Sequence, residues 1–157
     1  MTTITPCLWF DGNGLEAAEL YVSIIPDSRI TDVSYYGPDQ PGAEGAPLTV
    51  AFELAGRPYT ALNGGPQYKF TEAISLQVDC ADQAEIDDLW NKLTADGGEP
   101  GRCGWLKDRF GLSWQIVPAN MGQLIGGDDP AKAGRATQAM MGMNKLDIAA
   151  LEAARAG

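Results

Sequence analysis

Histidine is absent from this sequence of 157 residues. Histidine is the usual general base near neutral pH, so its absence excludes Ser-His-Asp and Cys-His catalysis. It is also the commonest transition-metal ligand in proteins. Any metal ion bound here would therefore depend on carboxylates, thiolates or amides alone.

Cysteines and basic residues are scarce. Cys7, Cys80 and Cys103 form an odd set without C-x-x-C spacing, which opposes a disulfide framework and a structural zinc site. We expect three free thiols. Eleven basic residues against 21 acidic ones give a net charge of −10. Such a balance opposes nucleic-acid binding, because phosphate contacts need clustered lysine and arginine.

Long apolar runs are also missing. No run approaches the ~18 apolar residues that a bilayer span requires, so we expect no membrane partner. The N-terminal stretch MTTITPCLWFDG has neither the basic nor the long apolar part of a secretory signal, so we expect a cytoplasmic protein. The length and the 45% hydrophobic content suit one compact domain, or two small halves sharing a core.

The residues that are present follow one pattern twice. Each half reads as a strand, an acidic turn, a helix and further strands, and such internal repetition is a fold-level signal. The first half has expected strands at 3–10, 29–37, 48–54 and 57–62, with a helix at 15–25. The second has expected strands at 73–79, 102–107 and 112–118, with a helix that begins after Asp82.

Apolar spacing and capping residues support these helices. Ala18, Tyr21, Val22 and Ile25, and again Ile86, Leu89, Trp90 and Leu93, recur at i, i+3, i+4 and i+7, the spacing of one helical face. Asp82 and Glu85 have the spacing of a capping box. Beyond residue 119 we expect helices that begin at Asp129-Pro130 and at Asp147. We expect modules at 1–66 and 67–120 and a helical extension at 121–157, all within one structural domain.

Several stretches resemble a known family. They are ITPCLWFDGN, LYVSIIP, TALNGGPQYKF, EAISLQVDC, CGWLKDRFGLSWQIVP and the tail from DPAKA to MMGMNKLDIAALEAA. They resemble the PhnB-like, or demethylubiquinone methyltransferase-like, branch of the vicinal-oxygen-chelate superfamily, which includes glyoxalase I, fosfomycin- and bleomycin-resistance proteins and extradiol dioxygenases. The resemblance implies an α+β fold of two βαβββ modules whose curved mixed sheets surround a cavity, with added C-terminal helices. It also implies a homodimer.

The resemblance further implies where a metal would bind. The metal enzymes of the superfamily carry histidine or glutamate ligands at positions that fall here on Thr5, Ala73, Gln115 and Asn63 or a neighbour of Asn63. None of these side chains is anionic, so none could offset the dehydration of a divalent ion. We therefore expect no metal and no cofactor. Gln115 instead offers a neutral donor and acceptor to an organic molecule.

Strand alternation predicts the cavity lining. The candidate ligand-binding residues are Thr5, Cys7, Trp9, Asn63, Ser75, Cys103, Trp105, Lys107 and Gln115. Tryptophans with a few polar groups are typical of a small-molecule site, although such tryptophans are more often core or interface packing residues than ligand contacts. Lys107 beside Asp108 indicates a solvated surface pair. The acidic net charge then favours a neutral or cationic ligand.

Glycine-rich motifs do not extend this interpretation. Leu62–Pro66 lacks the P-loop pattern, and Gly12-Asn13-Gly14 lacks the rest of a Rossmann-like unit, so a methyltransferase activity finds no support. Three hypotheses follow. The favoured one is a metal-free protein that binds a small molecule. The others are an enzyme that uses Cys103, Lys107 or Asp108, and a dimeric scaffold.

Overall fold

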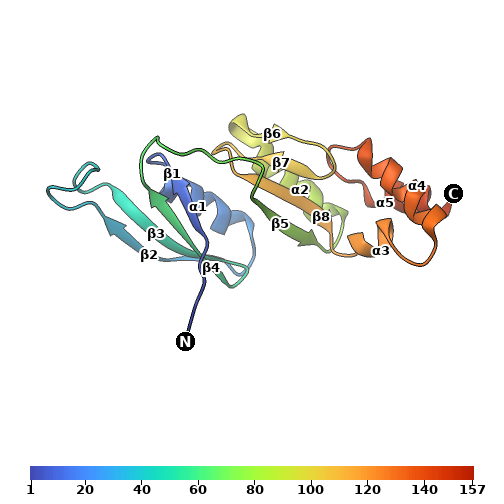
Figure 1. The fold of residues 1–157 in the computed structure, drawn as a ribbon, viewed down its shortest axis with the longest axis horizontal. Coiled ribbons are helices and arrows are strands. Elements are labelled where there is room, and N and C mark those ends of the chain that lie inside the picture. The colour runs from blue at the N-terminus through green and yellow to red at the C-terminus, as the bar shows by residue number, and fades with distance from the viewer. The chain divides into compact units, whose positions relative to one another are not determined.

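The computed structural model describes residues 1–157, and the chain forms two compact units, Met1–Phe70 and Thr71–Gly157. Each unit contains a four-stranded mixed sheet with a helix packed against it (Figure 1). The first compact unit ends at residue 70, and the expected first module ends at residue 66. The expected helical extension at 121–157 belongs to the second unit.

The first unit follows the β-α-β-β-β pattern. Its elements are β1 (Cys7–Phe10), α1 (Gly14–Ile24), β2 (Arg29–Tyr35), β3 (Pro47–Leu54) and β4 (Arg57–Asn63). The strand order is β1-β4-β3-β2, with β1 parallel to β4 and the other pairs antiparallel. Ala17, Ala18 and Tyr21 of α1 are fully buried, as are Val50 and Phe52 of β3. The small residues of α1 allow the helix to approach the sheet closely.

Local chemistry sets two boundaries in this unit. Ala55 and Gly56 both have positive φ, 48° and 76°, so they form the tight turn expected between β3 and β4. The first strand begins at Cys7, not at residue 3 as the sequence suggests, and residues 1–6 are exposed. Pro6 has no N–H for a sheet ladder, which accounts for the later start.

The second unit repeats this topology. Its strand order is β5-β8-β7-β6, with β5 parallel to β8. The elements are β5 (Ser75–Cys80), α2 (Gln83–Thr94), the 3₁₀ turn η1 (Ala95–Gly97), β6 (Glu99–Pro100), β7 (Trp105–Lys107) and β8 (Ser113–Pro118). All four predicted apolar positions of α2 are buried, and Asp82 caps this helix through the backbone N–H of Glu85. The predicted repeat is therefore confirmed.

The hairpin between β6 and β7 differs from the prediction. The expected strand at 102–107 is a strand only from Trp105 onward. Cys103 and Gly104 have φ of 58° and 84°, and Trp105 N donates to Arg102 O, so residues 102–105 form a tight turn. The pattern hid this turn because a Cys-Gly pair is a weaker turn signal than Asn-Gly.

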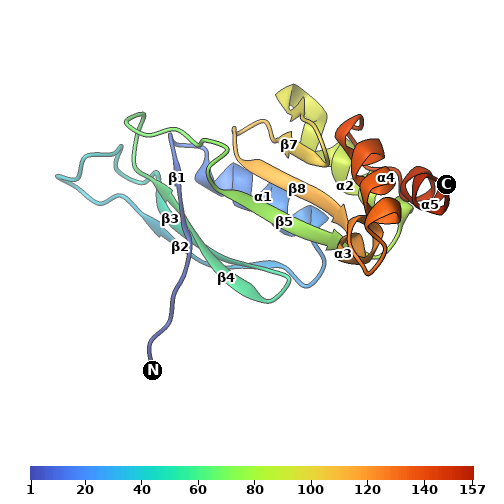
Figure 2. The ribbon, with the colours of Figure 1, turned by 45° about the vertical axis from the view of Figure 1, so that its right-hand side comes forward.

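Three helices complete the second unit, namely α3 (Met121–Ile125), α4 (Pro130–Met141) and α5 (Ile148–Ala156). They gather beyond the end of β8, with α4 against α5 (Figure 2). Leu146 and Leu151 are fully buried in a cluster with Val117 and Leu124. Asp129 and Asp147 cap α4 and α5 as predicted. None of the helices has the length and apolarity that crossing a bilayer requires.

Candidate functional site

The strand register of the second sheet sets two rows of side chains on the face that α2 leaves uncovered. Lys107 of β7 lies opposite Ser113 of β8, which lies opposite Ser75 of β5. In the next row, Trp105 lies opposite Gln115, which lies opposite Gln77. Because facing residues of neighbouring strands share a side of the sheet, these six side chains form one polar surface around an indole.

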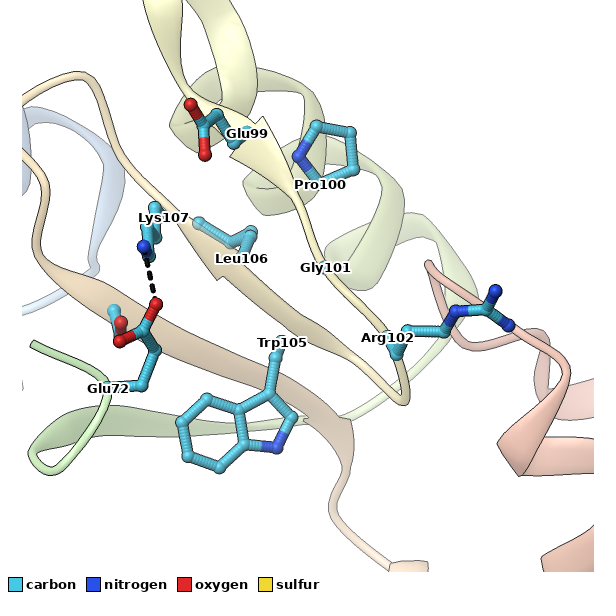
Figure 3. A pocket seen from close by; sticks show the side chains of 9 residues that line it. Glu72, Glu99, Pro100, Gly101, Arg102, Trp105, Leu106 and Lys107 are labelled. Atoms are coloured by element: carbon cyan, nitrogen blue, oxygen red, sulfur yellow. Dashed lines mark ion pairs between the residues drawn. The ribbon is translucent and has the colours of Figure 1, made fainter.

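A pocket of about 520 Å³ lies over part of this surface. It has the size of a small-molecule site. The lining residues come from the segment before β5, from the β6–β7 hairpin and from the start of β8, and they are Glu72, Glu99, Pro100, Gly101, Arg102, Trp105, Leu106, Lys107 and Ser113. The side chains of Lys107 and Glu72 point toward each other in the pocket, with the indole of Trp105 beside Glu72 (Figure 3).

Lys107 forms an ion pair with Glu72. Hydrogen bonding to Glu72 and the charge of Glu72 raise the pKa of Lys107, and the charge of Glu99 adds to the effect. The same hydrogen bond is the main cause of the lowered pKa of Glu72. Lys107 therefore stays protonated near neutral pH. A protonated amine suits the binding of an anion and opposes action as a general base.

Ser113 supplies a buried polar group without a partner. Ser113 is 1% exposed, and its hydroxyl has no hydrogen-bond partner in the structure. Most buried side-chain polar atoms are hydrogen-bonded, so such an orphan marks strain or a position that a water, an ion or a ligand completes. In the adjacent row, Gln115 Nε2 donates to Ser75 Oγ at 2.9 Å. These two predicted site residues lie together, beside the residues that line the pocket.

Asp108 has a structural role that the sequence did not reveal. It is 2% exposed, and its carboxylate accepts hydrogen bonds from the backbone N–H groups of Phe110 and Leu112 and from Trp114 Nε1. The expected surface pair of Lys107 with Asp108 is therefore wrong. Successive residues of a strand point to opposite faces, so Lys107 reaches the pocket while Asp108 turns inward and holds the β7–β8 hairpin.

The cysteines are free thiols, as expected. Burial and the nearby charges of Glu85, Asp79 and Asp82 raise the pKa of Cys80 to about 12, so Cys80 carries almost no thiolate at neutral pH. Cys103 lies in the β6–β7 turn, outside the strand that was expected to place it beside Trp105 and Lys107. Its backbone N–H donates to Met143 O at 2.8 Å and ties the turn to the C-terminal segment. Cys7 is exposed at the start of β1.

In the first unit, Trp9 already makes a hydrogen bond and an aromatic contact within the protein. Its Nε1 donates to Gly65 O at 2.8 Å, and its ring meets Tyr68 edge-on with centroids 4.9 Å apart. A Cβ on Gly64 would lie 2.3 Å from the Trp9 ring, so only glycine fits at that position. Trp9 therefore fastens the loop after β4. Its additional role as a ligand contact stays a prediction.

Asn63 caps α1. Its Oδ1 accepts from Gly14 N at 2.8 Å and its Nδ2 donates to Pro47 O at 3.0 Å. It lies opposite Phe10 in the β1–β4 register, while Leu62 lies opposite Trp9. The neighbour Leu62 thus shares the side of Trp9, and Asn63 faces the helix. Asn63 also occupies the α1 N-terminus, which opposes phosphate binding at Gly12-Asn13-Gly14.

The donor set does not fit the metal that the resemblance implies. Thr5 and Ala73 lie in exposed segments before β1 and β5, and Ala73 N donates to Thr71 Oγ1 in a local turn. The fourth position belongs to Leu62 or Asn63, and Gln115 is already bonded to Ser75. No group of three or more cysteine, aspartate or glutamate side chains in residues 1–157 is arranged to hold a metal ion. We therefore derive no chemistry from a metal.

The sequence identified part of this pocket. Trp105 and Lys107, which the sequence predicts as ligand-binding residues, line this pocket, and Ser113 lines it as well. That Trp105 and Lys107 contact a ligand stays a prediction. Glu72, Glu99, Pro100 and Arg102 were missed. Glu72 directly precedes the expected strand at 73–79, and an acidic residue at that place was the one available signal. The β6 residues gave none, because a proline argues against a strand.

Comparisons with known proteins agree with the fold. A family model described as 3-demethylubiquinone-9 3-methyltransferase matches residues 2–117. A structure from Bacillus cereus, described as a putative 3-demethylubiquinone-9 3-methyltransferase and PhnB protein, is 32% identical. The match covers 75% of this chain and 100% of that chain, with a TM-score of 0.69. A search of curated proteins finds no match.

More distant structures share the fold alone. A protein from Pseudomonas aeruginosa is 21% identical over 75% of this chain and 98% of its own, with a TM-score of 0.61. The fosfomycin resistance protein FosX from Listeria monocytogenes, in complex with Mn(II) and sulfate, is 13% identical. That match covers 78% of this chain and 93% of FosX, with a TM-score of 0.51.

Proposed function

Because this chain belongs to the 3-demethylubiquinone-9 3-methyltransferase family, the PhnB-like branch of the vicinal-oxygen-chelate superfamily, we propose that it binds a small organic molecule on the open face of a module sheet and does so without a metal. The single observation that carries this proposal is the 520 Å³ pocket of the second unit, where a tryptophan, a protonated lysine and an unpartnered serine hydroxyl converge.

Physical chemistry favours binding over catalysis at this pocket. Lys107 is protonated and ion-paired, Asp108 is committed to the hairpin and Cys103 lies in a turn. The three residues considered for proton transfer or nucleophilic attack are therefore not poised for it. We keep Gln115 and Ser75 in the proposed site, because their hydrogen-bonded pair lies in the row beside the pocket and can offer further polar contacts.

The test is a thermal-shift screen of a metabolite pool, followed by calorimetric titration of each hit. We expect hits to raise the melting temperature of the wild-type protein, and Trp105→Ala to weaken them about tenfold, since aromatic contact adds about 0.5–1.5 kcal/mol beyond burial. Tyr35→Ala is the matched control, because Tyr35 is an exposed aromatic residue of the first unit. Hits that ignore Trp105→Ala would contradict the proposal.

Elemental analysis of protein purified without chelators tests the metal-free part. We expect well under about one equivalent of zinc, nickel, manganese or iron per chain, because the four implied positions carry no anionic side chain. A stoichiometric metal that is lost on Gln115→Ala would overturn this part of the proposal.

A further inference from the structure

The occupant of the anion position beside Lys107 is a residue of the chain itself. Glu72 lies in the segment before β5, and its side chain is 62% exposed, while that of Lys107 is 40% exposed. An ion pair so open to solvent is weak and easily exchanged. The geometry around Lys107 accepts a carboxylate. Apart from Lys107, that carboxylate is held by a hydrogen bond with the backbone N–H of Glu72 itself, and no buried contact keeps it in place.

Ser113 adds a second requirement at the same point. It faces Lys107 across the β7–β8 register and lines the same pocket, yet its buried hydroxyl has no partner even though Glu72 reaches Lys107. The internal carboxylate therefore satisfies the lysine but leaves the serine unsatisfied. A group that contacts both would gain a hydrogen bond that Glu72 does not make.

The apolar part of the pocket lies beside this polar point. Trp105 is two residues from Lys107 on β7, so the two side chains share one face of the sheet. Pro100 and Leu106 also line the pocket. Arg102, the other cation of the lining, points away from Lys107 (Figure 3). The pocket thus has one cationic contact with an aromatic platform next to it.

Resting on the proposed function, we propose that the ligand is a small aryl or alkyl monocarboxylate, and that Glu72 is an internal competitor for its place. The ligand carboxylate displaces Glu72 from Lys107 and accepts a hydrogen bond from the Ser113 hydroxyl. The body of the ligand lies against Trp105. Glu72 thereby excludes anions that bind weakly. Only a ligand that also hydrogen-bonds to Ser113 and packs against Trp105 displaces it.

This assignment replaces the expectation of a neutral or cationic ligand. That expectation rested on the amides, hydroxyls and indoles of the predicted open faces and on the acidic net charge, with Lys107 set aside. The structure pairs Lys107 with Glu72 and commits Asp108 to backbone N–H groups. With Asp108 turned inward, Lys107 is available to the pocket. The net charge of −10 still repels anions at long range, and the contact with Lys107 acts at short range.

Three probes that share a phenyl ring test which ligand charge the pocket prefers. They are benzoate (anionic), benzamide (neutral) and benzylamine (cationic), and each is titrated calorimetrically into the full-length protein. We expect benzoate to bind at least about tenfold more tightly than either of the others, as charge-assisted hydrogen bonds are the strong ones. Tighter binding of benzylamine or benzamide would overturn the proposal. The proposal would also be overturned if benzoate, at concentrations up to about 10 mM, bound neither the wild type nor Glu72→Gln.

Variants separate competition from bulk charge. Glu72→Gln should strengthen benzoate binding about threefold or more, because it removes the competing carboxylate. Lys107→Gln should abolish benzoate binding, because it removes the cation. Asp88→Asn is the matched control, because it removes one charge and one exposed ion pair, with Lys92, on α2 and away from the pocket. Equal effects of Glu72→Gln and Asp88→Asn would contradict a competing role of Glu72.

Ser113→Ala distinguishes a ligand contact from a structural residue. We expect it to weaken benzoate about tenfold while leaving the melting temperature unchanged or higher, because it deletes an unsatisfied buried group. A lowered melting temperature with unchanged affinity would assign Ser113 to the fold instead. If the metabolite screen finds neutral or cationic ligands that need Trp105, the proposed function stands and this inference alone fails.

Discussion

Asp108 shows how one side chain can decide a local structure. It lies in the stretch DRFG, where the sequence places a turn, and its carboxylate gathers two backbone donors and one indole. Gly111 in the same turn has φ of 88°, which favours glycine. The hairpin that carries Lys107 and Ser113 to the pocket therefore depends on a buried charge.

We predict that Asp108→Asn lowers the free energy of unfolding by about 2–4 kcal/mol, the cost of weakening buried hydrogen bonds to a charged group. An amide at this position either turns a donor toward Trp114 Nε1 or loses backbone contacts. Urea unfolding monitored by circular dichroism measures the change. Asp96→Asn, an exposed carboxylate at the preceding turn, is the control and should stay within about 0.5 kcal/mol of the wild type.

A second variant checks the cause. Trp114→Phe removes the indole donor, so adding Asp108→Asn to Trp114→Phe should cost less than adding it to the wild type. The difference is the coupling energy of the pair in a double-mutant cycle. Additive effects of the two substitutions would show that Asp108 acts through the backbone alone.

At the scale of elements, capping and burial patterns were predictable and pairing was not. The sequence fixes α2 well, because Ile86, Leu89, Trp90 and Leu93 lie on one face and Asp82 caps it. The sequence places the starts of β1 and β5 too early. Pro6 has no N–H to donate to a neighbouring strand, and Ala73 N donates to Thr71 Oγ1 in a local turn instead of to the sheet. The strand β6 has only two residues, too few for any period to show.

The same limit applies to the site. Alternation along a strand gave the side of Trp105, Lys107 and Gln115, because that property is local. The partner of Lys107 was not predictable, since Glu72 is distant in sequence and reaches it only through the pairing of β5 with β8 and of β8 with β7. Asn63 was assigned to the wrong side because its register was uncertain by one residue, which exchanges the two faces.

We predict that acid loosens the C-terminal helices through two carboxylates. Hydrogen bonding to Lys132 N lowers the pKa of Asp129, and hydrogen bonding to Lys145 lowers the pKa of Asp87. A carboxyl whose pKa is lowered by folding stabilises the protein above its ordinary value of 3.8, and this stabilisation is lost as pH falls through the lowered value.

The measurement compares urea unfolding at about pH 6 with unfolding at a series of pH values that falls from the ordinary pKa of 3.8 to well below it. The wild type should lose more stability than the Asp87→Asn, Asp129→Asn double variant, whose amides do not titrate. Asparagine replaces the aspartate cap of α4 well, and Asp87 is a partly exposed residue inside α2, so the double variant should fold normally. An equal loss in the two proteins would show that other carboxyl groups govern the acid response.

At the scale of the whole molecule, the C-terminal segment buries most of its large apolar side chains itself. Leu146 and Leu151 are buried within their own unit, and Met140 and Met143 pack against the same cluster, so this segment gives little support to association. Exposed apolar side chains remain in the first unit and before β5, at Ile4, Tyr35, Tyr68 and Ile74, and one lies at the end of α4, at Met141. Ile74 directly precedes β5, an edge strand, and such a residue favours pairing with another surface.

We predict a homodimer in solution. Light scattering at micromolar concentration should give twice the mass of the 16.7 kDa chain. Ile74→Lys should shift the distribution toward the single chain, because it places a charge where an apolar contact is expected. Met141→Lys, at an exposed site on α4, is the comparison. A single-chain mass for the wild type would refute the prediction.

The two-residue strand β6 has a consequence for the behaviour of the protein at high concentration. An open strand edge is a template on which other chains can polymerise, and long apolar edges lead to fibres. The outermost strand beside β7 consists of Glu99, which is charged, and Pro100, which has no N–H to donate. The sheet edge next to the pocket therefore pairs poorly with a further strand. The pocket can stay open to small solutes without exposing an edge on which fibrils could grow.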